Sequence, residues 1–239
     1  MNAGEGIPPR EIVTAFAELG VTAFTTTRAD ADYALAEPDA SPAALAHWQA
    51  LLASFGAAVP RLASARQVHG TRVIEHGGDW HGWVRHEGAD GHLAFAPGTA
   101  MAVTVADCVP VFLATADGVA GILHAGWRGT AGRIVTKALD QLAARGIDAA
   151  RVHVHLGPGI CGRCYEVGPD VFEQLTGWTT IRNRHVDLRA LLSEQAKEYG
   201  VARVTSSPHC SRCDNDRFYS HRAGDSGRQV AVIAALPRP

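Results

Sequence analysis

Three short apolar runs, at residues 101–105, 110–114 and 119–123, constrain the fold of this chain more than any other feature. Each run is short, apolar and bounded by turn-forming residues, a pattern that predicts buried strands. Residues 130–145 then switch to helical spacing of apolar side chains, and Gly146 follows as a helix stop signal. The order strand, turn, helix predicts a fold that mixes the two kinds of element.

Other segments extend this pattern on both sides. Alternating or continuous apolar residues predict strands over 151–156, 201–205 and 229–236, and helical spacing predicts helices over 42–55 and 188–199. We therefore expect an α/β (α+β) fold, a single-domain sandwich of mixed β-sheets with flanking helices. The length of 239 residues favours one domain that spans residues 1–239.

Composition excludes several classes of protein. With 22 Lys and Arg against 24 Asp and Glu, the net charge is −2, so no global positive field would gather nucleic acid or an anionic membrane. No uninterrupted apolar run approaches the roughly 20 residues that span a bilayer. The N-terminal residues show neither a secretory signal nor a transit peptide, which predicts a cytoplasmic protein. The five cysteines favour thiols, metal ligands or a catalytic Cys over a secreted disulfide framework.

Three candidate metal ligands fall at the ends of short apolar strands: His69, Cys108 and His124. Two imidazoles and one thiolate supply three protein ligands and leave a fourth position open, as in catalytic zinc sites. The competing interpretation is that Cys108 is a small buried apolar residue and each His an ordinary hydrogen-bonded side chain. Spacing alone does not separate these two interpretations.

Arg128 lies in the segment Gly-Trp-Arg-Gly-Thr between a predicted strand and a predicted helix. Backbone N–H groups and the guanidinium could converge there on one anion, which indicates a local phosphate site. The alternative is a tight turn that carries a solvated arginine. The segment lacks the Lys-Ser/Thr ending of a P-loop, so ATP chemistry is not indicated.

The other four cysteines form two Cys-x-x-Cys pairs, Cys161 with Cys164 and Cys210 with Cys213. They would make a four-cysteine zinc site if the fold brought the pairs together. The gap between the pairs is longer than in a usual zinc ribbon, so the sequence favours unlinked thiols. We expect these cysteines to lie outside the catalytic site.

A family resemblance covers the chain from about residue 65 to its end. The matching motifs are Gln67-Val68-His69-Gly70, Ala89-Asp90-Gly91, Ala106-Asp107-Cys108-Val109-Pro110-Val111, His124-Ala125-Gly126-Trp127-Arg128-Gly129-Thr130, Leu156-Gly157-Pro158-Gly159-Ile160 with Cys164-Tyr165-Glu166-Val167, and Arg217-Phe218-Tyr219-Ser220 with Gly227-Arg228-Gln229. In this order they resemble the multicopper polyphenol oxidase (laccase-like) family, also called the peptidoglycan editing factor family and now regarded as purine nucleoside phosphorylases.

The resemblance implies an enzyme that cleaves adenosine, inosine and related purine nucleosides with phosphate, with adenosine deamination as a second activity. It implies Zn²⁺ at the three candidate ligands, with Cu²⁺ as the alternative. Arg128 would act in catalysis and bind substrate, together with Gln67 and Arg222 as further substrate-binding residues. Asp90 and Asp107 would orient ligands or accept a proton, and Glu166 is a candidate pocket residue. The expected partners are purine nucleosides and phosphate, not nucleic acid or membrane.

Two segments depart from the family pattern. Residues 29–38 replace the Gly-Gly-x-Ser and Asn-Leu segments that usually follow the opening strand, and Ser220-His221-Arg222-Ala223-Gly224-Asp225 replaces Ser-Tyr-Arg-Arg-Asp-Gly.

Two other classes of function remain as alternatives. A copper oxidase is one, although the chain has only two Met residues and no pair of His-x-His motifs. A non-catalytic, metal-stabilised binding protein is the other.

Overall fold

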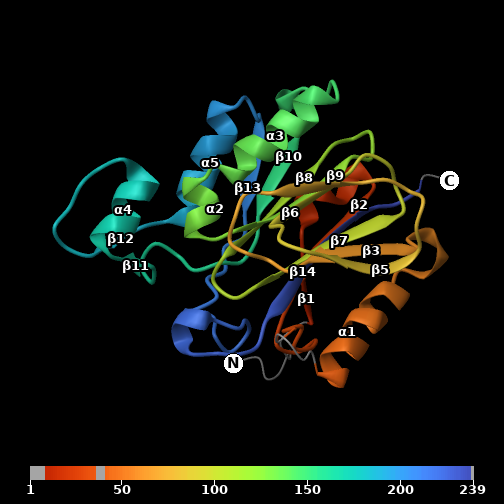
Figure 1. Cartoon of the computed structure of the whole chain (residues 1–239), viewed down its shortest axis with the longest axis horizontal. Helices are drawn as coiled ribbons and strands as arrows, with labels where there is room; N and C mark the ends of the chain where they lie inside the picture. Colours follow the sequence, from red (N-terminus) through yellow and green to blue (C-terminus); the bar gives the residue numbers. More distant parts are fainter. Residues whose placement is uncertain (1–8, 36–40, 238–239) are drawn as a thin grey trace, which may run out of the picture.

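Two six-stranded β-sheets face each other at the centre of the computed structural model, which describes residues 9–35 and 41–237 (Figure 1). In spatial order, the first sheet consists of β1 (Arg10–Ile12), β2 (Val21–Thr26), β14 (Gln229–Ala235), β7 (Thr99–Val105), β3 (Arg61–Ala65) and β5 (Gly82–His86). Its first three pairings are antiparallel and its last two are parallel, so the sheet is mixed.

The second sheet carries most of the segments that build the site. Its spatial order is β13 (Arg203–Ser206), β10 (His153–Leu156), β8 (Val109–Ala114), β9 (Ala120–Ala125), β6 (Gly91–Ala94) and β4 (Val73–His76). The outer pairs β13–β10 and β6–β4 are parallel, and the inner pairs are antiparallel. A separate two-stranded sheet joins β11 (Glu166–Val167) to β12 (Arg184–His185).

Helices cover the outer faces of the two sheets, and this layering matches the expected sandwich with flanking helices. The α-helices are α1 (Pro42–Ala53), α2 (Trp127–Ala131), α3 (Ile134–Ala144), α4 (Pro169–Thr176) and α5 (Leu188–Glu198). The 3-10 turns are η1 (Thr14–Leu19), η2 (Gly56–Ala58), η3 (Ala149–Arg151) and η4 (His221–Ala223). Helices α3 and α5 pack on the second sheet, and α1 packs on the first, where Trp48 stacks on Trp83 with ring centroids 5.0 Å apart.

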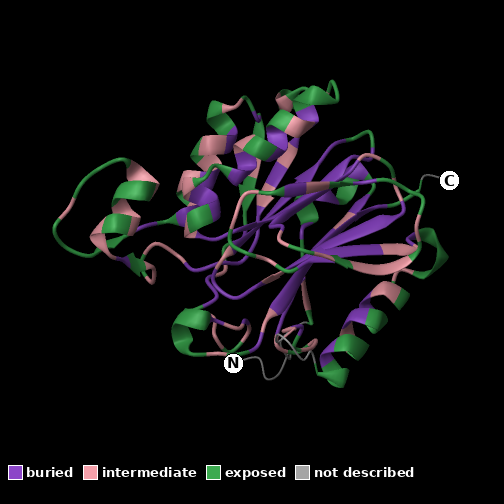
Figure 2. Ribbon diagram, in the orientation of Figure 1, coloured by how far each residue is buried: buried purple, intermediate pink, exposed green. Residues whose placement is uncertain are grey.

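The central core lies between the two sheets, and Figure 2 shows buried residues along both of them. Phe112 and Ile122 from the second sheet pack with Met101 and Ile233 from the first, and none of the four is accessible to solvent. The strands predicted at 101–105, 110–114 and 119–123 are therefore confirmed as β7, β8 and β9, with bounds shifted by one or two residues. Among the described residues, no helix combines the length and the apolar character needed to cross a bilayer.

The helix predicted for residues 130–145 differs from the structure. The helical turn begins earlier, at Trp127, and the chain breaks after Ala131 before α3 starts at Ile134. At the break, Arg133 takes a left-handed conformation with φ of 57°. Gly132 lies so close to another segment that a Cβ atom there would stand 2.6 Å from the Thr71 side chain. The helix therefore breaks at Gly132, a residue of low helix propensity that packs closely against the loop before β4.

We expect Phe112→Ala to lower the free energy of unfolding by about 3–5 kcal/mol, because the change leaves a cavity between the sheets. Chemical denaturation monitored by fluorescence and circular dichroism would measure the loss. Ile181→Ala is the control, since Ile181 is 93% exposed and its removal should change stability by less than about 0.5 kcal/mol. Equal stability of the two variants would contradict the assignment of Phe112 to the core.

Candidate active site

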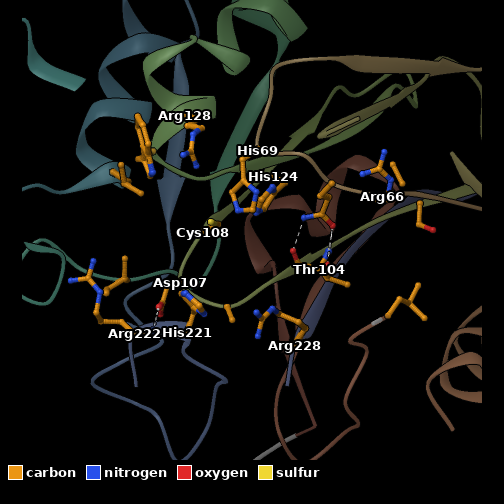
Figure 3. A pocket seen from close by; sticks show the side chains of 18 of the residues that line it. Arg66, His69, Thr104, Asp107, Cys108, His124, Arg128, His221, Arg222 and Arg228 are labelled. Carbon is orange, nitrogen blue, oxygen red and sulfur yellow. Dashed lines mark hydrogen bonds between the residues drawn. The ribbon is translucent and has the colours of Figure 1, made fainter. Parts of the chain in front are cut away.

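The three predicted metal ligands converge although they come from different segments. His69 lies in the loop after β3, Cys108 lies in the turn before β8, and His124 is near the end of β9. Their ligand atoms all lie within 4.8 Å of one another, and the two imidazole rings meet edge to face with centroids 4.8 Å apart. Figure 3 shows the three side chains gathered at one point of a cavity. The prediction that these residues meet agrees with the structure, which makes the cluster a candidate metal site.

A buried carboxylate, Asp90, orients this cluster from behind. Its Oδ1 accepts a hydrogen bond from His124 Nδ1 at 2.8 Å, which leaves Nε2 as the free ligand atom. The same carboxylate accepts the backbone N–H groups of Val68, His69 and Gly70 at 2.7–3.2 Å. Asp90 is completely buried, and a buried carboxylate is costly because it loses its hydration. The four hydrogen bonds compensate this loss. One side chain therefore fixes the loop of one ligand and the ring orientation of another.

Two residues of the site adopt left-handed backbone conformations. His69 has φ of 59° and Asp107 has φ of 84°, a region that non-glycine residues enter rarely. In both cases hydrogen bonds hold the strained turn: the N–H of His69 donates to Asp90, and the C=O of Asp107 accepts from Ile160 at 2.9 Å. Strained backbone conformations of this kind cluster at functional sites, where contacts with the surrounding structure hold them in place.

The electrostatics favour a charged thiolate at Cys108. Burial by itself would raise the pKa of the Cys108 thiol, but His124 and His69 beside it outweigh this effect and lower the pKa to about 6. Burial would lower the pKa of His124, but Cys108 and Asp90 reverse this and raise it to about 9. For Asp90, the hydrogen bonds from His124 and from the backbone outweigh burial and lower the pKa. The thiolate is the form of cysteine that binds metal ions.

Gly126 provides the space for the cluster. A Cβ atom at this position would stand 2.8 Å from Cys108 Sγ and 3.2 Å from His69 Cδ2. Any side chain at residue 126 would therefore push into the space that the three ligand side chains share.

A cavity of about 560 Å³ opens in front of the cluster. The ring of Tyr165, among others, lines it, and so do five arginines against one carboxylate among the described residues, that of Asp107. These arginines are Arg66, Arg85, Arg128, Arg222 and Arg228. The volume is that of a small-molecule site, and the charge balance suits an anion.

Arg128 lies at this cavity on α2 (Figure 3). Its guanidinium lies 4.4 Å from the centre of the Trp127 ring. Within the described ranges 9–35 and 41–237, no hydrogen bond or ion pair engages this guanidinium. It is therefore able to bind an anion without breaking an existing interaction.

The remaining predicted site residues have distinct surroundings. Gln67 lines the cavity, but its side-chain amide donates to Thr104 O and accepts from Thr104 N and Oγ1, which joins the loop to β7. Asp107 accepts hydrogen bonds from Ser211 Oγ, Ser220 Oγ and the backbone N–H of Arg222.

Arg222 lines the cavity and donates to the backbone carbonyl of Glu166 at 3.1 Å. Glu166 itself is exposed on β11 and lies outside the cavity lining. The candidate assignment of Glu166 to the pocket is therefore wrong. Tyr165, the residue before β11, lines the cavity instead.

Sequence reasoning missed three of the cavity arginines. Arg66 immediately precedes the Gln67-Val68-His69-Gly70 motif and Arg228 lies within the Gly227-Arg228-Gln229 motif, so both carried a usable signal. Arg85 comes from β5, a strand that the apolar pattern did not predict, and nothing around it marked a site.

A family model described as multi-copper polyphenol oxidoreductase laccase matches residues 20–236. The chain belongs to this family. It is 38% identical over 200 residues to a purine nucleoside phosphorylase of Deinococcus radiodurans, an alignment that covers 79% of this chain and 75% of that protein. It is 36% identical over 163 residues to adenosine deaminase RL5 from an unknown prokaryotic organism, covering 62% of each protein.

Solved structures of similar fold support the architecture of this family member. YlmD from Geobacillus stearothermophilus superimposes with a TM-score of 0.88 over 98% of both chains, at 24% sequence identity. The fold of this laccase-family chain is therefore that of YlmD.

We expect Gly126→Ala to lower the free energy of unfolding by about 1–3 kcal/mol, because its Cβ overpacks the ligand cluster. Gly168→Ala is a matched control: Gly168 also precedes a helix in an extended conformation, but a Cβ there meets nothing within 4 Å. Thermal and chemical denaturation would compare the two variants. If the Gly126→Ala protein were as stable as the Gly168→Ala protein, the ligand cluster would have space for a Cβ atom at residue 126, which would contradict the prediction.

Proposed function

We propose that this protein is a zinc-dependent purine nucleoside phosphorylase. Its substrates would be adenosine, inosine and related nucleosides, which phosphate converts to the free base and ribose 1-phosphate. Adenosine deamination to inosine and ammonia would be a second activity. The names of the similar proteins, purine nucleoside phosphorylase and adenosine deaminase, support this class of reaction.

One observation carries the proposal: the His69, Cys108 and His124 cluster and the Arg128 guanidinium share one cavity of about 560 Å³. A nucleoside and a phosphate ion together need a site of this order of size. The cluster offers a metal site at one wall, and the arginines offer an anion site in the same space. A binding site for a neutral ligand requires neither a metal site nor a group of arginines.

The donor set fits zinc. Two imidazoles and one thiolate with an open fourth position form a set that catalytic zinc uses, and Asp90 behind His124 supplies the outer hydrogen bond that such histidines require. When bound, zinc would supply a Lewis acid that polarises a ligand oxygen or lowers the pKa of a water molecule. Type-1 copper sites commonly add an axial methionine, but Met101 is buried in the core between the sheets and does not line the cavity.

In phosphorolysis, a phosphate oxygen forms a bond to the ribose anomeric carbon while the bond from that carbon to the base nitrogen breaks. The base leaves with the electron pair and takes up a proton. Arg128 would hold the phosphate by charge-assisted hydrogen bonds, and Arg222 would add a second positive charge across the cavity. Positioning the two reactants in this way supplies a large part of the rate.

Tyr165 is a neutral hydrogen-bond donor in this site. Burial raises the pKa of its hydroxyl to about 12, and Arg222 lies 5.1 Å from the centre of its ring. At neutral pH the O–H is therefore present and able to donate to a nucleoside hydroxyl or base nitrogen. Asp90 and Asp107 would act as positioning residues, because their carboxylate oxygens already accept hydrogen bonds from the protein.

We expect Cys108→Ala to lose the zinc of the catalytic site together with phosphorolysis. The thiolate is the one charged ligand of the set, so its removal weakens the metal site most. Metal analysis of the purified protein and a phosphate-dependent nucleoside cleavage assay would test this together. Zinc at this site in the Cys108→Ala protein would contradict the assignment, and copper in the wild type with oxidase activity would favour the polyphenol oxidase alternative.

We expect Arg128→Ala to raise the phosphate concentration needed for half-maximal rate by about 10- to 100-fold, because one charge-assisted hydrogen bond contributes about 1.5–3 kcal/mol. Zinc content should stay normal, and deamination of adenosine should survive. Ribose 1-phosphate and inosine would be measured from one reaction mixture, beside a melting curve.

The control is Arg133→Ala, which removes an equal charge from an exposed arginine that pairs with Glu198. Its phosphate dependence should match that of the wild type. Equal loss of both products in a destabilised Arg128→Ala protein would show instead that Arg128 only braces the start of α2.

A further inference from the structure

The two Cys-x-x-Cys pairs lie close together in the structure, although their long separation in the sequence favours unlinked thiols. The Sγ atoms of Cys161, Cys164, Cys210 and Cys213 are all within 4.8 Å of one another. The physical reason is the parallel pairing of β10 and β13, in which Leu156 lies opposite Ser206. Cys161 follows the first of these positions by five residues and Cys210 follows the second by four. Similar offsets from paired strand ends bring the two pairs to the same place.

The distances suit a tetrahedral metal site. A zinc ion bound to four thiolates has Zn–S bonds of about 2.3 Å, which places the sulfur atoms about 3.8 Å apart. Cys164 Sγ and Cys213 Sγ lie 3.4 Å apart, and the complete set lies within 4.8 Å. Small rotations of side chains would bring all four sulfur atoms to bonding distance.

Backbone donors point at one of the four sulfur atoms. Cys210 Sγ accepts hydrogen bonds from the N–H groups of Cys161 at 3.2 Å and of Cys213 at 3.4 Å. Backbone donors aimed at sulfur stabilise the thiolate form that a metal requires.

The charges near the cluster are complementary to a metal-bound set. Four thiolates and one divalent ion leave two negative charges. Each pair contains an arginine at the third position, Arg163 and Arg212, and Arg212 donates to the backbone carbonyl of Cys164 at 3.4 Å. The positive side chain of Arg212, which this bond holds beside Cys164, would offset part of the remaining charge.

We infer that Cys161, Cys164, Cys210 and Cys213 bind a structural zinc ion, separate from the catalytic cluster. All four positions are filled by protein sulfur, so the site has no open position for a substrate. The metal would cross-link the loop after β10 to the loop after β13. Gly159 and Cys210 already form an isolated parallel bridge there, and Ser211 N donates to Gly159 O.

This cross-link would brace one wall of the catalytic cavity. Ile160 and Tyr165 line the cavity from the first loop, and His221 and Arg222 line it from the segment that follows the second. Ser211, which lies between two of the zinc ligands, donates its hydroxyl to Asp107 at 2.6 Å, and Asp107 precedes Cys108. The zinc would therefore stabilise the shape of the substrate site without touching the substrate.

The test measures the zinc content of the wild type and of the variants by elemental mass spectrometry. We expect a Cys164→Ala/Cys213→Ala protein to contain about one zinc fewer per chain than the wild type. Cys213 is exposed and Cys164 is partly exposed, so these changes remove little packing. Cys164→His should keep the zinc, because imidazole can replace one thiolate ligand. An unchanged zinc content in the double variant, or iron in place of zinc, would overturn the inference.

Three further measurements separate this site from the catalytic one. Cys108→Ala should still hold the zinc of the four cysteines, so a failure of the proposed catalytic metal would leave this result unchanged. In protein purified without reductant, denaturation with a chelator should expose all five thiols of the wild type. Fewer free thiols would indicate disulfides and overturn the inference. Amide hydrogen exchange in residues 157–167 and 207–223 should accelerate in the double variant, and unchanged exchange after zinc loss would overturn the bracing role.

Discussion

The buried carboxylate of Asp90 is the interaction on which the candidate site depends. An ionised carboxyl group without solvent contact is costly unless hydrogen bonds compensate it, and here four of them do. Three come from the loop that carries His69, and the fourth comes from His124 on the neighbouring strand β9. The requirement to satisfy one buried charge therefore positions two ligands, and Cys108 joins them from the turn before β8, the strand that pairs with β9.

A second carboxylate connects this centre to the C-terminal part of the chain. Asp107 accepts hydrogen bonds from Ser211, Ser220 and the backbone of Arg222, three residues more than 100 positions later in the sequence. These bonds hold the segment after β13 against the turn before β8, and the N–H of Ile160, in the loop after β10, donates to the backbone carbonyl of Asp107. The four-cysteine cluster lies between the same loops, so a metal there would reinforce an arrangement that hydrogen bonds already favour.

Much of the fold could be predicted from local pattern, and the exceptions have physical causes. Continuous apolar runs predicted β7, β8 and β9 because both faces of these strands are buried. Strands such as β4 and β5 escaped prediction because they are short and carry polar side chains such as Glu75 and Arg85. The break between α2 and α3 was not predicted, because it coincides with a tertiary contact between Gly132 and Thr71. The spacing of apolar residues along a helix does not show such a contact.

The sequence by itself determined the chemistry that is available: ligand side chains at strand ends, an arginine between a strand and a helix, and two cysteine pairs. It determined these because they depend on local pattern and residue type. Only the tertiary structure decided which of them meet. The parallel register of β10 and β13 unites Cys161 with Cys210, and sheet pairing brings Arg85 from β5 to the cavity of Arg128. Contacts of this kind rest on strand register over long sequence separations, and a single strand's pattern carries no information about its partner.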